Sequence, residues 1–273
     1  MTRKILYALL ISLLLAACTE KTSVKLDSTY ARLVVDGNIQ SGTGVYRVTL
    51  TRSSDYFSNA PAPPVRGAAV TLSDGATTFT LHETTGDSGS TGIYETDSTF
   101  TGVAGKTYTL HIQLAEPIAG KSAYEASSVL NPVTRLDSIG TEFHEDWGKK
   151  GFWIVRLWAQ EPGNEVNYYM FNLYRNGKLL TDTIFKKVVS DDKYFNGSYM
   201  NGVDVIYLDN SQDWETIYPG DTIMLQMSGI TREYYDFVNE VDMSGYSIPF
   251  FSGPPANIKG NISGGGIGFF IAY

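Results

Sequence analysis

Histidine and cysteine form most metal and redox sites, and this 273-residue chain contains only three histidines and one cysteine, Cys18. His82, His111 and His144 do not have the paired spacing of a zinc site, and a lone thiol forms no disulfide within one chain. His82 and His111 fall in predicted strands, whereas His144-Glu145-Asp146 is a polar stretch typical of a loop. We predict no catalytic residues, no metal centre and no cofactor.

Acidic and amide oxygens suited to calcium gather at Asp204, Asp209, Asn210 and Asp213. Their spacing matches no calcium loop, so turn formation by Asp and Asn is the simpler interpretation. The sequence leaves calcium binding open.

The sequence Gly86-Asp87-Ser88-Gly89 is similar to the nucleophile segment of chymotrypsin-like serine proteases. A serine needs a positioned base, and in that family the base histidine lies far upstream, whereas the earliest histidine here, His82, is only four residues away. Ser90 also departs from the family pattern. We predict a hairpin loop, and a protein that is not an enzyme.

A second glycine-rich stretch, residues 264–268, lacks the features of a phosphate loop. Such loops open into a helix, whereas an aromatic strand follows here. We predict that these glycines permit a bulge or a close approach of the backbone.

Aromatic side chains give the strongest indication of binding, because the chain has 18 Tyr, 13 Phe and 4 Trp. Most belong in a core, but residues 193–199 and 214–218 combine aromatic residues with Asn, Gly and Asp in loop-like sequence. That mixture suits a surface that stacks on a sugar or contacts a protein. We predict a glycan, peptide or partner surface at Tyr194, Phe195, Tyr199, Trp214 and Tyr218.

The first residues have the order of an export signal. Arg3 and Lys4 precede an apolar run over residues 5–17 that is too short to cross a bilayer, and Cys18 follows directly. Leu15-Ala16-Ala17-Cys18 resembles the lipobox of bacterial lipoproteins. The resemblance implies that residues 1–17 are a signal peptide and that the Cys18 sulfur carries the lipid.

Residues 18–29 are polar and predict a tether between the lipidated Cys18 and the first domain. In enterobacterial lipoproteins an Asp directly after the cysteine favours the inner membrane, whereas this chain has Thr19 there. The resemblance therefore implies the outer membrane, with either a periplasmic or a cell-surface location. Asp27-Ser28-Thr29 is similar to an O-glycosylation motif of some Gram-negative bacteria, which makes Ser28 a candidate for modification.

Net charge argues against nucleic acid as a partner. The chain has a net charge of −8, and without Arg3 and Lys4 the count is 19 basic (21 − 2) against 29 acidic residues, or −10. Phosphate backbones are bound by clustered Lys and Arg, whereas this sequence has only the short pairs Lys149-Lys150 and Lys186-Lys187, which are typical of a solvated loop or strand edge.

Short alternating segments bounded by Gly, Pro, Ser and Asp predict an all-β protein with two β-sandwich domains. The first domain covers residues 30–131 and the second covers residues 132–273, after Asn131-Pro132. Expected strands are 32–40, 46–51, 69–72, 77–82, 107–114 and 124–129, followed by 152–158, 168–174, 178–184, 203–208, 222–227 and 268–272.

Local signals sharpen this organisation at two places in the second domain. Asn176-Gly177 predicts a two-residue hairpin turn. Near residues 231–243, apolar residues at helical spacing follow Thr231, which is placed to cap a helix, so we predict one helix docked on a sandwich-like or barrel-like β-domain.

Two family resemblances extend the interpretation. Val65-Arg66-Gly67-Ala68-Ala69-Val70-Thr71-Leu72 and Gly105-Lys106-Thr107-Tyr108-Thr109-Leu110 resemble transthyretin-like and carboxypeptidase-regulatory-like sandwiches, which implies a transthyretin-like or immunoglobulin-like fold for residues 30–131. Residues 249–270, with Asn261-Ile262-Ser263-Gly264-Gly265-Gly266-Ile267-Gly268-Phe269, resemble the ending of a group of Gram-negative outer-membrane lipoproteins classified as a domain of unknown function.

Members of that group are often encoded beside TonB-dependent receptors. The resemblance implies a non-enzymatic lipoprotein, anchored in the outer membrane, that binds a ligand or docks on such a receptor during nutrient uptake. The alternative is a structural or adhesive cell-surface module.

Overall fold

Alternation of apolar and polar residues builds the first half of the protein as a sheet with one buried face. The computed structural model describes residues 31–54, 60–87, 89–163, 165–245 and 258–273. Along β1 (Leu33–Ile39), every second residue is buried, as expected for a strand that covers a core. The sheet has eight strands in the order β17 (Ile267–Ala272), β1, β3 (Arg47–Arg52), β6 (Gly89–Glu95), β5 (Thr78–Gly86), β4 (Ala69–Ser73), β8 (Thr107–Ile118) and β9 (Lys121–Val129).

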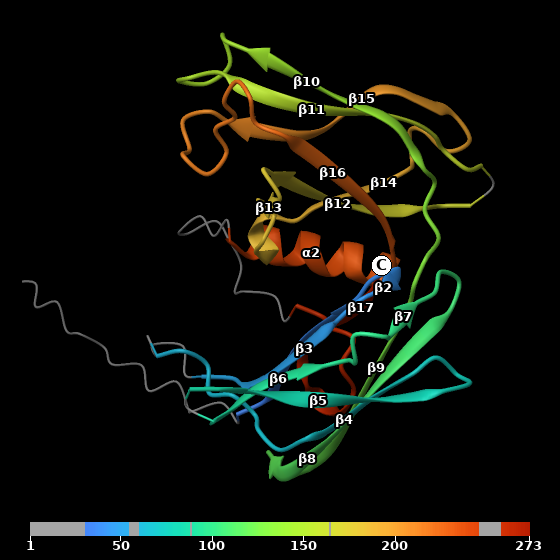
Figure 1. The fold of residues 1–273 in the computed structure, drawn as a ribbon, viewed down its shortest axis with the longest axis vertical. Helices are drawn as coiled ribbons and strands as arrows, with labels where there is room; N and C mark the ends of the chain where they lie inside the picture. Colours follow the sequence, from blue (N-terminus) through green and yellow to red (C-terminus); the bar gives the residue numbers. More distant parts are fainter. Residues whose placement is uncertain (1–30, 55–59, 88, 164, 246–257) are drawn as a thin grey trace, which may run out of the picture. The chain divides into compact units, whose positions relative to one another are not determined.

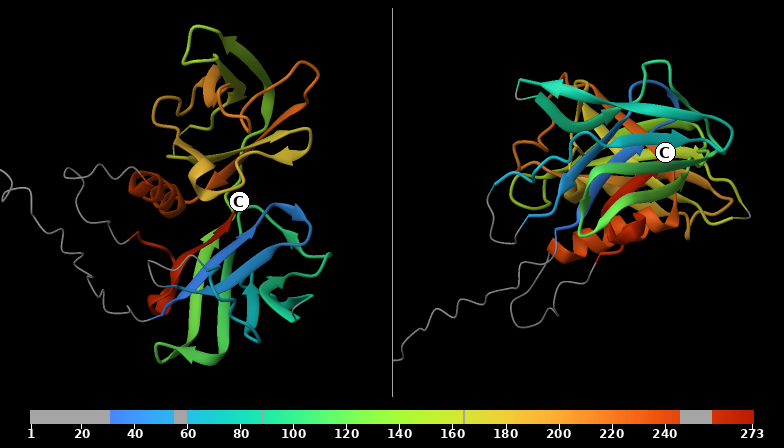
Figure 2. Two further views of the ribbon diagram at one scale, coloured as in Figure 1. Left: turned by 90° about the vertical axis from the view of Figure 1, so that its left-hand side faces the viewer. Right: turned by 90° about the horizontal axis from the view of Figure 1, so that it is seen from below.

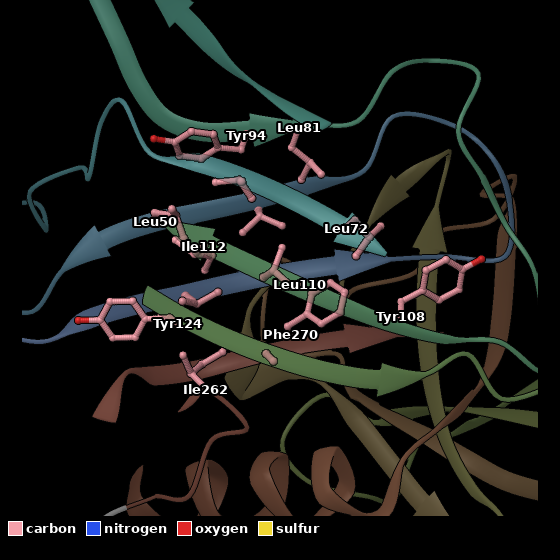
Figure 3. Packing of buried hydrophobic residues seen from close by; sticks show 14 of the residues in the cluster. Leu50, Leu72, Leu81, Tyr94, Tyr108, Leu110, Ile112, Tyr124, Ile262 and Phe270 are labelled. Atoms are coloured by element: carbon pink, nitrogen blue, oxygen red, sulfur yellow. The ribbon is translucent and has the colours of Figure 1, made fainter. Parts of the chain in front are cut away.

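The sheet folds over at β5. Residues 78–81 of this strand pair with β4, whereas residues 82–86 pair with β6. Both halves of the folded sheet therefore supply side chains to one core, in which Leu50, Tyr94 and Leu110 are almost completely buried (Figure 3). The short strands β2 (Gly42–Thr43) and β7 (Thr101–Gly102) pair separately.

The final strand, β17, belongs to this first sheet although it is the last element in the chain. It runs parallel to β1 (Figure 2), and its Phe270 lies in the same core as Leu33. The Ala272 amide donates to Ser128 Oγ at 2.9 Å, so β17 also lies beside β9 and brings the two ends of the sheet together. A division of the chain at residue 131 does not include this long-range pairing.

Two sheets form the second half (Figure 1). The first contains β10 (Leu136–His144), β11 (Phe152–Gln160) and β15 (Tyr199–Asp209), and the second contains β13 (Lys178–Leu179), β12 (Tyr168–Arg175), β14 (Val188–Asp191) and β16 (Ile223–Ile230). Leu157, Phe171 and Leu225 join them in a shared core. Face-to-face packing of two sheets is the arrangement of a sandwich.

Strand β12 is covered on both faces, which explains its nearly continuous apolar sequence. Tyr169, Phe171 and Leu173 face the sandwich core, while Met170 packs with Phe269 and with helix α2 (Arg232–Gly245). The predicted helix is confirmed, and the Tyr234 amide donates to the Thr231 hydroxyl at its start. No helix in the ranges described is long and apolar enough to cross a membrane.

The all-β prediction is confirmed, and one expected strand is shorter than predicted. The turn at Asn176-Gly177 is present with φ of 52° and 78°, but β13 ends at Leu179. The chain then leaves the sheet through Thr181, whose hydroxyl donates to Asn172, and forms the short helix η1 (Ile184–Lys186) before β14 returns to the same edge of β12. This excursion places residues 182–187 beside β1.

Candidate functional site

A cleft of about 490 Å³ lies where β1 and β17 meet β12, α2 and the segment around η1. Every one of these elements contributes side chains to its wall. The pairing of β17 with β1 and the packing of β17 against α2 hold the two sides together. The cleft therefore depends on contacts between residues more than 200 positions apart in the chain.

Opposite charges face the cleft from its two sides. Asp36 projects from β1 and stays open to solvent, and Lys187 follows η1 and is partly buried. Partial removal from water raises the pKa of Asp36, an effect that the charge of Lys187 opposes. The same cause lowers the pKa of Lys187, opposed by Asp36. The two groups are not among the direct ion pairs of the described residues, so each can bind a further polar group.

Polar side chains hold these charges in place. Lys187 Nζ donates to Asn172 Oδ1 at 3.1 Å, and Asn172 is 2% exposed within β12. The Tyr273 hydroxyl accepts from Gln40 Nε2 at 3.1 Å, and burial raises its pKa to about 12. Tyr273 is therefore a neutral hydrogen-bonding group at ordinary pH.

Most of the remaining wall is apolar, although Asn38, Gln40 and Asp182 also line the cleft. Met170, Tyr234 and Phe269 belong to one buried cluster, and Phe237 packs against it. Tyr234 lies edge-on to Phe269, with ring centroids 5.0 Å apart. An apolar wall with a few oriented polar groups is the usual composition of a small-ligand site. The cleft can bind a molecule with an apolar part, a cationic group near Asp36 and an anionic group near Lys187.

Local sequence signals missed this site. Asp36 and Asn38 occupy alternate positions in a predicted strand, and polar residues in that pattern usually indicate the face of a sheet that is exposed to solvent. The Lys186-Lys187 pair has the appearance of an exposed loop. Only the return of β17 to β1 gives these residues a common cleft.

The predicted aromatic surface is divided by the structure. Tyr194, Tyr199, Trp214 and Tyr218 are all exposed, whereas Phe195 packs against the sandwich core. Tyr199 begins the 11-residue strand β15, which spans about 30 Å, and Trp214 follows its other end. Tyr199 and Trp214 therefore do not belong to one continuous patch, and Lys186 Nζ lies 4.4 Å from the centroid of the Trp214 ring.

Another aromatic group, which the sequence reasoning missed, lies on the outer face of the β10–β11–β15 sheet. Trp147 stacks on His144 at 4.3 Å and lies nearly parallel to Tyr207 at 6.4 Å. Trp147 is 43% and Tyr207 51% exposed. The turn sequence between β10 and β11 was the available signal, because a tryptophan in a polar turn is unusual.

The other sequence candidates have structural roles. Asp204 pairs with Arg156, and the Asp209 carboxylate accepts the Ser211 amide at 2.8 Å in a turn. His82, His111 and His144 each lie near a single carboxylate. Within the described ranges, no group of three or more His, Cys, Asp and Glu side chains gathers as a metal site.

The glycine-rich stretches also have structural roles. Gly86 and Gly89 are paired across the β5–β6 hairpin, and Ser88 lies outside the described residues. Gly268 has φ of 94°, and a Cβ there would lie 2.1 Å from the Val35 carbonyl oxygen. This glycine permits the close approach of β17 to β1, as the sequence predicted.

Cys18, Ser28 and residues 249–257 of the C-terminal motif lie outside the described residues. Lipidation of Cys18 and glycosylation of Ser28 stay predictions.

In the ranges that the structure describes, the chain is an all-β protein with one docked α-helix and a cleft between its halves. The family model described as "Domain of unknown function (DUF4249)" matches residues 19–273. The chain belongs to this family. Comparison with curated proteins and with solved structures finds no match.

Proposed function

We propose that this protein is a non-enzymatic lipoprotein of the outer membrane that binds a small ligand in its cleft and serves a TonB-dependent receptor in nutrient uptake. The position of Cys18 after an apolar run supports the anchor. The similarity of the chain to lipoproteins encoded beside such receptors supports the partner.

The cleft is the observation that carries the proposal. Asp36 and Lys187 are both partly withdrawn from water, and no direct ion pair consumes either charge. A ligand with complementary charges would interact with both groups in a setting that screens them less than bulk water does. Short peptides have this chemistry at their termini, and their side chains suit the apolar wall.

Affinity purification of the intact chain from outer membranes tests the partner. We expect a TonB-dependent receptor to co-purify from a nonionic detergent extract, and the Cys18→Ser variant to lose both membrane attachment and receptor. Repeated purification without any TonB-dependent receptor would contradict the receptor part of the proposal.

Thermal shift assays with defined probes test the cleft separately. We expect a dipeptide mixture to raise the melting temperature of the wild type and to have no effect on the Asp36→Asn/Lys187→Met variant. Asp97→Asn, which removes an exposed acid outside the cleft, is the matched control and should respond like the wild type. Equal responses of all three proteins would show that the cleft is not the site.

The alternative, a structural or adhesive module, is favoured by the exposed group His144, Trp147 and Tyr207. Flat exposed aromatic rings are typical of surfaces that stack on sugars or anchor a partner protein. Under this alternative, Trp147→Ala would abolish binding to an oligosaccharide mixture or to a host polymer, and deletion of the protein would leave uptake unchanged.

A further inference from the structure

Two buried carboxylates lie on neighbouring segments of the second half, outside the lining of the cleft. Glu161 directly follows β11 and Asp192 directly follows β14. Their exposed fractions are 1% and 2%. Full burial of an ionised carboxylate costs several kcal/mol unless hydrogen bonds or an opposite charge compensate it.

Most of their oxygen atoms have no such compensation. Glu161 Oε1 accepts from the Tyr169 hydroxyl at 2.6 Å and from Asn167 Nδ2 at 3.2 Å. Glu161 Oε2 and both carboxylate oxygens of Asp192 have no hydrogen-bond partner in the part of the chain that the structure describes. Three buried carboxylate oxygens therefore lack a donor.

The backbone joins these two residues. The Asp192 amide donates to the Asn167 carbonyl at 3.1 Å, and the Asn167 side chain contacts Glu161. The Glu161 amide in turn donates to the Ser198 carbonyl at 3.1 Å. Burial raises the pKa of Glu161, and the charge of Asp192 raises it further, so the two carboxylates are within electrostatic reach of each other.

Among the described residues, neither a basic side chain nor a proton shared between the two carboxyl groups compensates the charges of Glu161 and Asp192. No Lys, Arg or His forms an ion pair with Glu161 or Asp192. A shared proton requires a hydrogen bond between the two carboxyl groups, and the described contacts of Glu161 go to Tyr169 and Asn167 instead. A cation bound between the two groups would balance both charges when they are ionised and would give the free oxygen atoms a partner.

The available ligands select the cation. The three unpartnered atoms are all carboxylate oxygens. No His nitrogen or Cys sulfur is among the described contacts of Glu161 and Asp192, which disfavours zinc and copper as the metal. Loops supply the ligands, and carboxylate oxygens in flexible loops suit calcium better than the strict octahedron of magnesium.

We propose that Glu161 and Asp192 bind one Ca²⁺ ion between the loop after β11 and the loop after β14. Tyr169 and Asn167 act as positioning residues that orient Glu161. The ion joins Glu161, held by Asn167, to residues 192–198, the loop that presents the exposed Tyr194. The proposal is independent of the ligand that the cleft binds.

Calcium titration of the intact, chelator-stripped protein in nonionic detergent tests the site. At a hundredfold excess of Ca²⁺ over its Kd, we expect the melting temperature to rise by about 5 to 10 °C, with a smaller rise for Mg²⁺. Glu161→Gln and Asp192→Asn should each weaken Ca²⁺ binding at least tenfold. Asp213→Asn, in the other acidic stretch, should respond like the wild type.

Terbium luminescence of the wild type keeps the test decisive if a variant does not fold. Tyr169, in contact with Glu161, should sensitise emission from bound Tb³⁺, and excess Ca²⁺ should quench it. Emission lifetimes in H₂O and D₂O should show that protein oxygen atoms replace part of the coordinated water. The proposal would be overturned if millimolar Ca²⁺ had no effect on the wild type, if both folded variants responded like the wild type, or if Asp213→Asn lost the response. A fully hydrated Tb³⁺ ion would also overturn it.

Discussion

The cleft and the buried acidic site both withdraw two charged side chains from water, but the charges differ in sign and in access. Asp36 and Lys187 are opposite charges in a cleft that stays open, whereas Glu161 and Asp192 are like charges with almost no exposed surface. Asp36 and Lys187 attract each other without direct contact, and a ligand can replace the water molecules that solvate them. Glu161 and Asp192 repel each other when both are ionised, and the proposed Ca²⁺ ion would balance their charges.

Charge reversal in the cleft should have the largest effect on stability. Lys187→Glu gives the cleft two like charges and removes the donor to Asn172 Oδ1. We expect the free energy of unfolding to fall by about 2 kcal/mol, less than for a fully buried pair because solvent screens the cleft. Urea denaturation measures the change.

A second reversal provides the control for this prediction. Asp36→Lys combined with Lys187→Glu restores opposite charges and should recover most of the lost stability. Equal stability of Lys187→Glu and wild type would show that the two groups do not interact, and the comparison between the regions would fail.

Removal of one charge from the buried pair Glu161 and Asp192 should raise the free energy of unfolding instead of lowering it. In excess chelator, Asp192→Asn removes one of two repelling buried charges, so we expect the free energy of unfolding to rise by about 1 kcal/mol. Saturating Ca²⁺ should reverse the order, because only the wild type binds the ion fully. The measurement is denaturant unfolding of both proteins under the two conditions, and destabilisation of Asp192→Asn in chelator would contradict it.

The pH dependence of the ion-free protein should show the same repulsion. The folded pKa of Glu161 lies above the ordinary value of 4.5, so the folded state holds this proton to higher pH than the unfolded chain does. Stability should therefore fall as pH rises from about 4.5 through the folded pKa. Glu161→Gln should remove this decline, and saturating Ca²⁺ should oppose it, since the ion binds the deprotonated form. Unfolding curves measured from about pH 4 upward would check this.

The turn that contains Asp74 should give the smallest effect on stability, and it serves as a reference for the cleft and for the buried acidic pair. Asp74 accepts hydrogen bonds from Lys106, Thr77 and Ala76, which lower its pKa from 3.8 to about 2. This contribution is present above pH 3.8 and is lost as pH falls toward 2, so the small difference between wild type and Asp74→Asn should disappear over that range. Carboxyl NMR of Asp74 measures the pKa directly, and an ordinary value of 3.8 would contradict the account.

Local signals predicted the elements better than the sites. The helix start at Thr231 and the turn at Asn176-Gly177 follow from contacts within a few residues, and both are present. The parallel pairing of β17 with β1 joins opposite ends of the chain, and no local pattern specifies it. The cleft depends on that pairing and was therefore not predicted.

Burial of charge was equally invisible in the sequence. Glu161-Pro162-Gly163 and Asp191-Asp192-Lys193 have the composition of exposed loops. Packing of these loops against Tyr169 and Asn167 withdraws Glu161 and Asp192 from water, and this depends on tertiary structure. The acidic candidates Asp204 and Asp209 were conspicuous in the sequence, but Asp204 is paired with Arg156 and Asp209 accepts the amide of Ser211.

Native mass spectrometry of the intact protein in nonionic detergent tests the central claim that the cleft binds a ligand. The account predicts a bound small molecule on the wild type and its loss from the Asp36→Asn/Lys187→Met variant, with Asp97→Asn like the wild type. The same bound mass on all three proteins, or no bound mass on any of them even after addition of the dipeptide mixture, would contradict it.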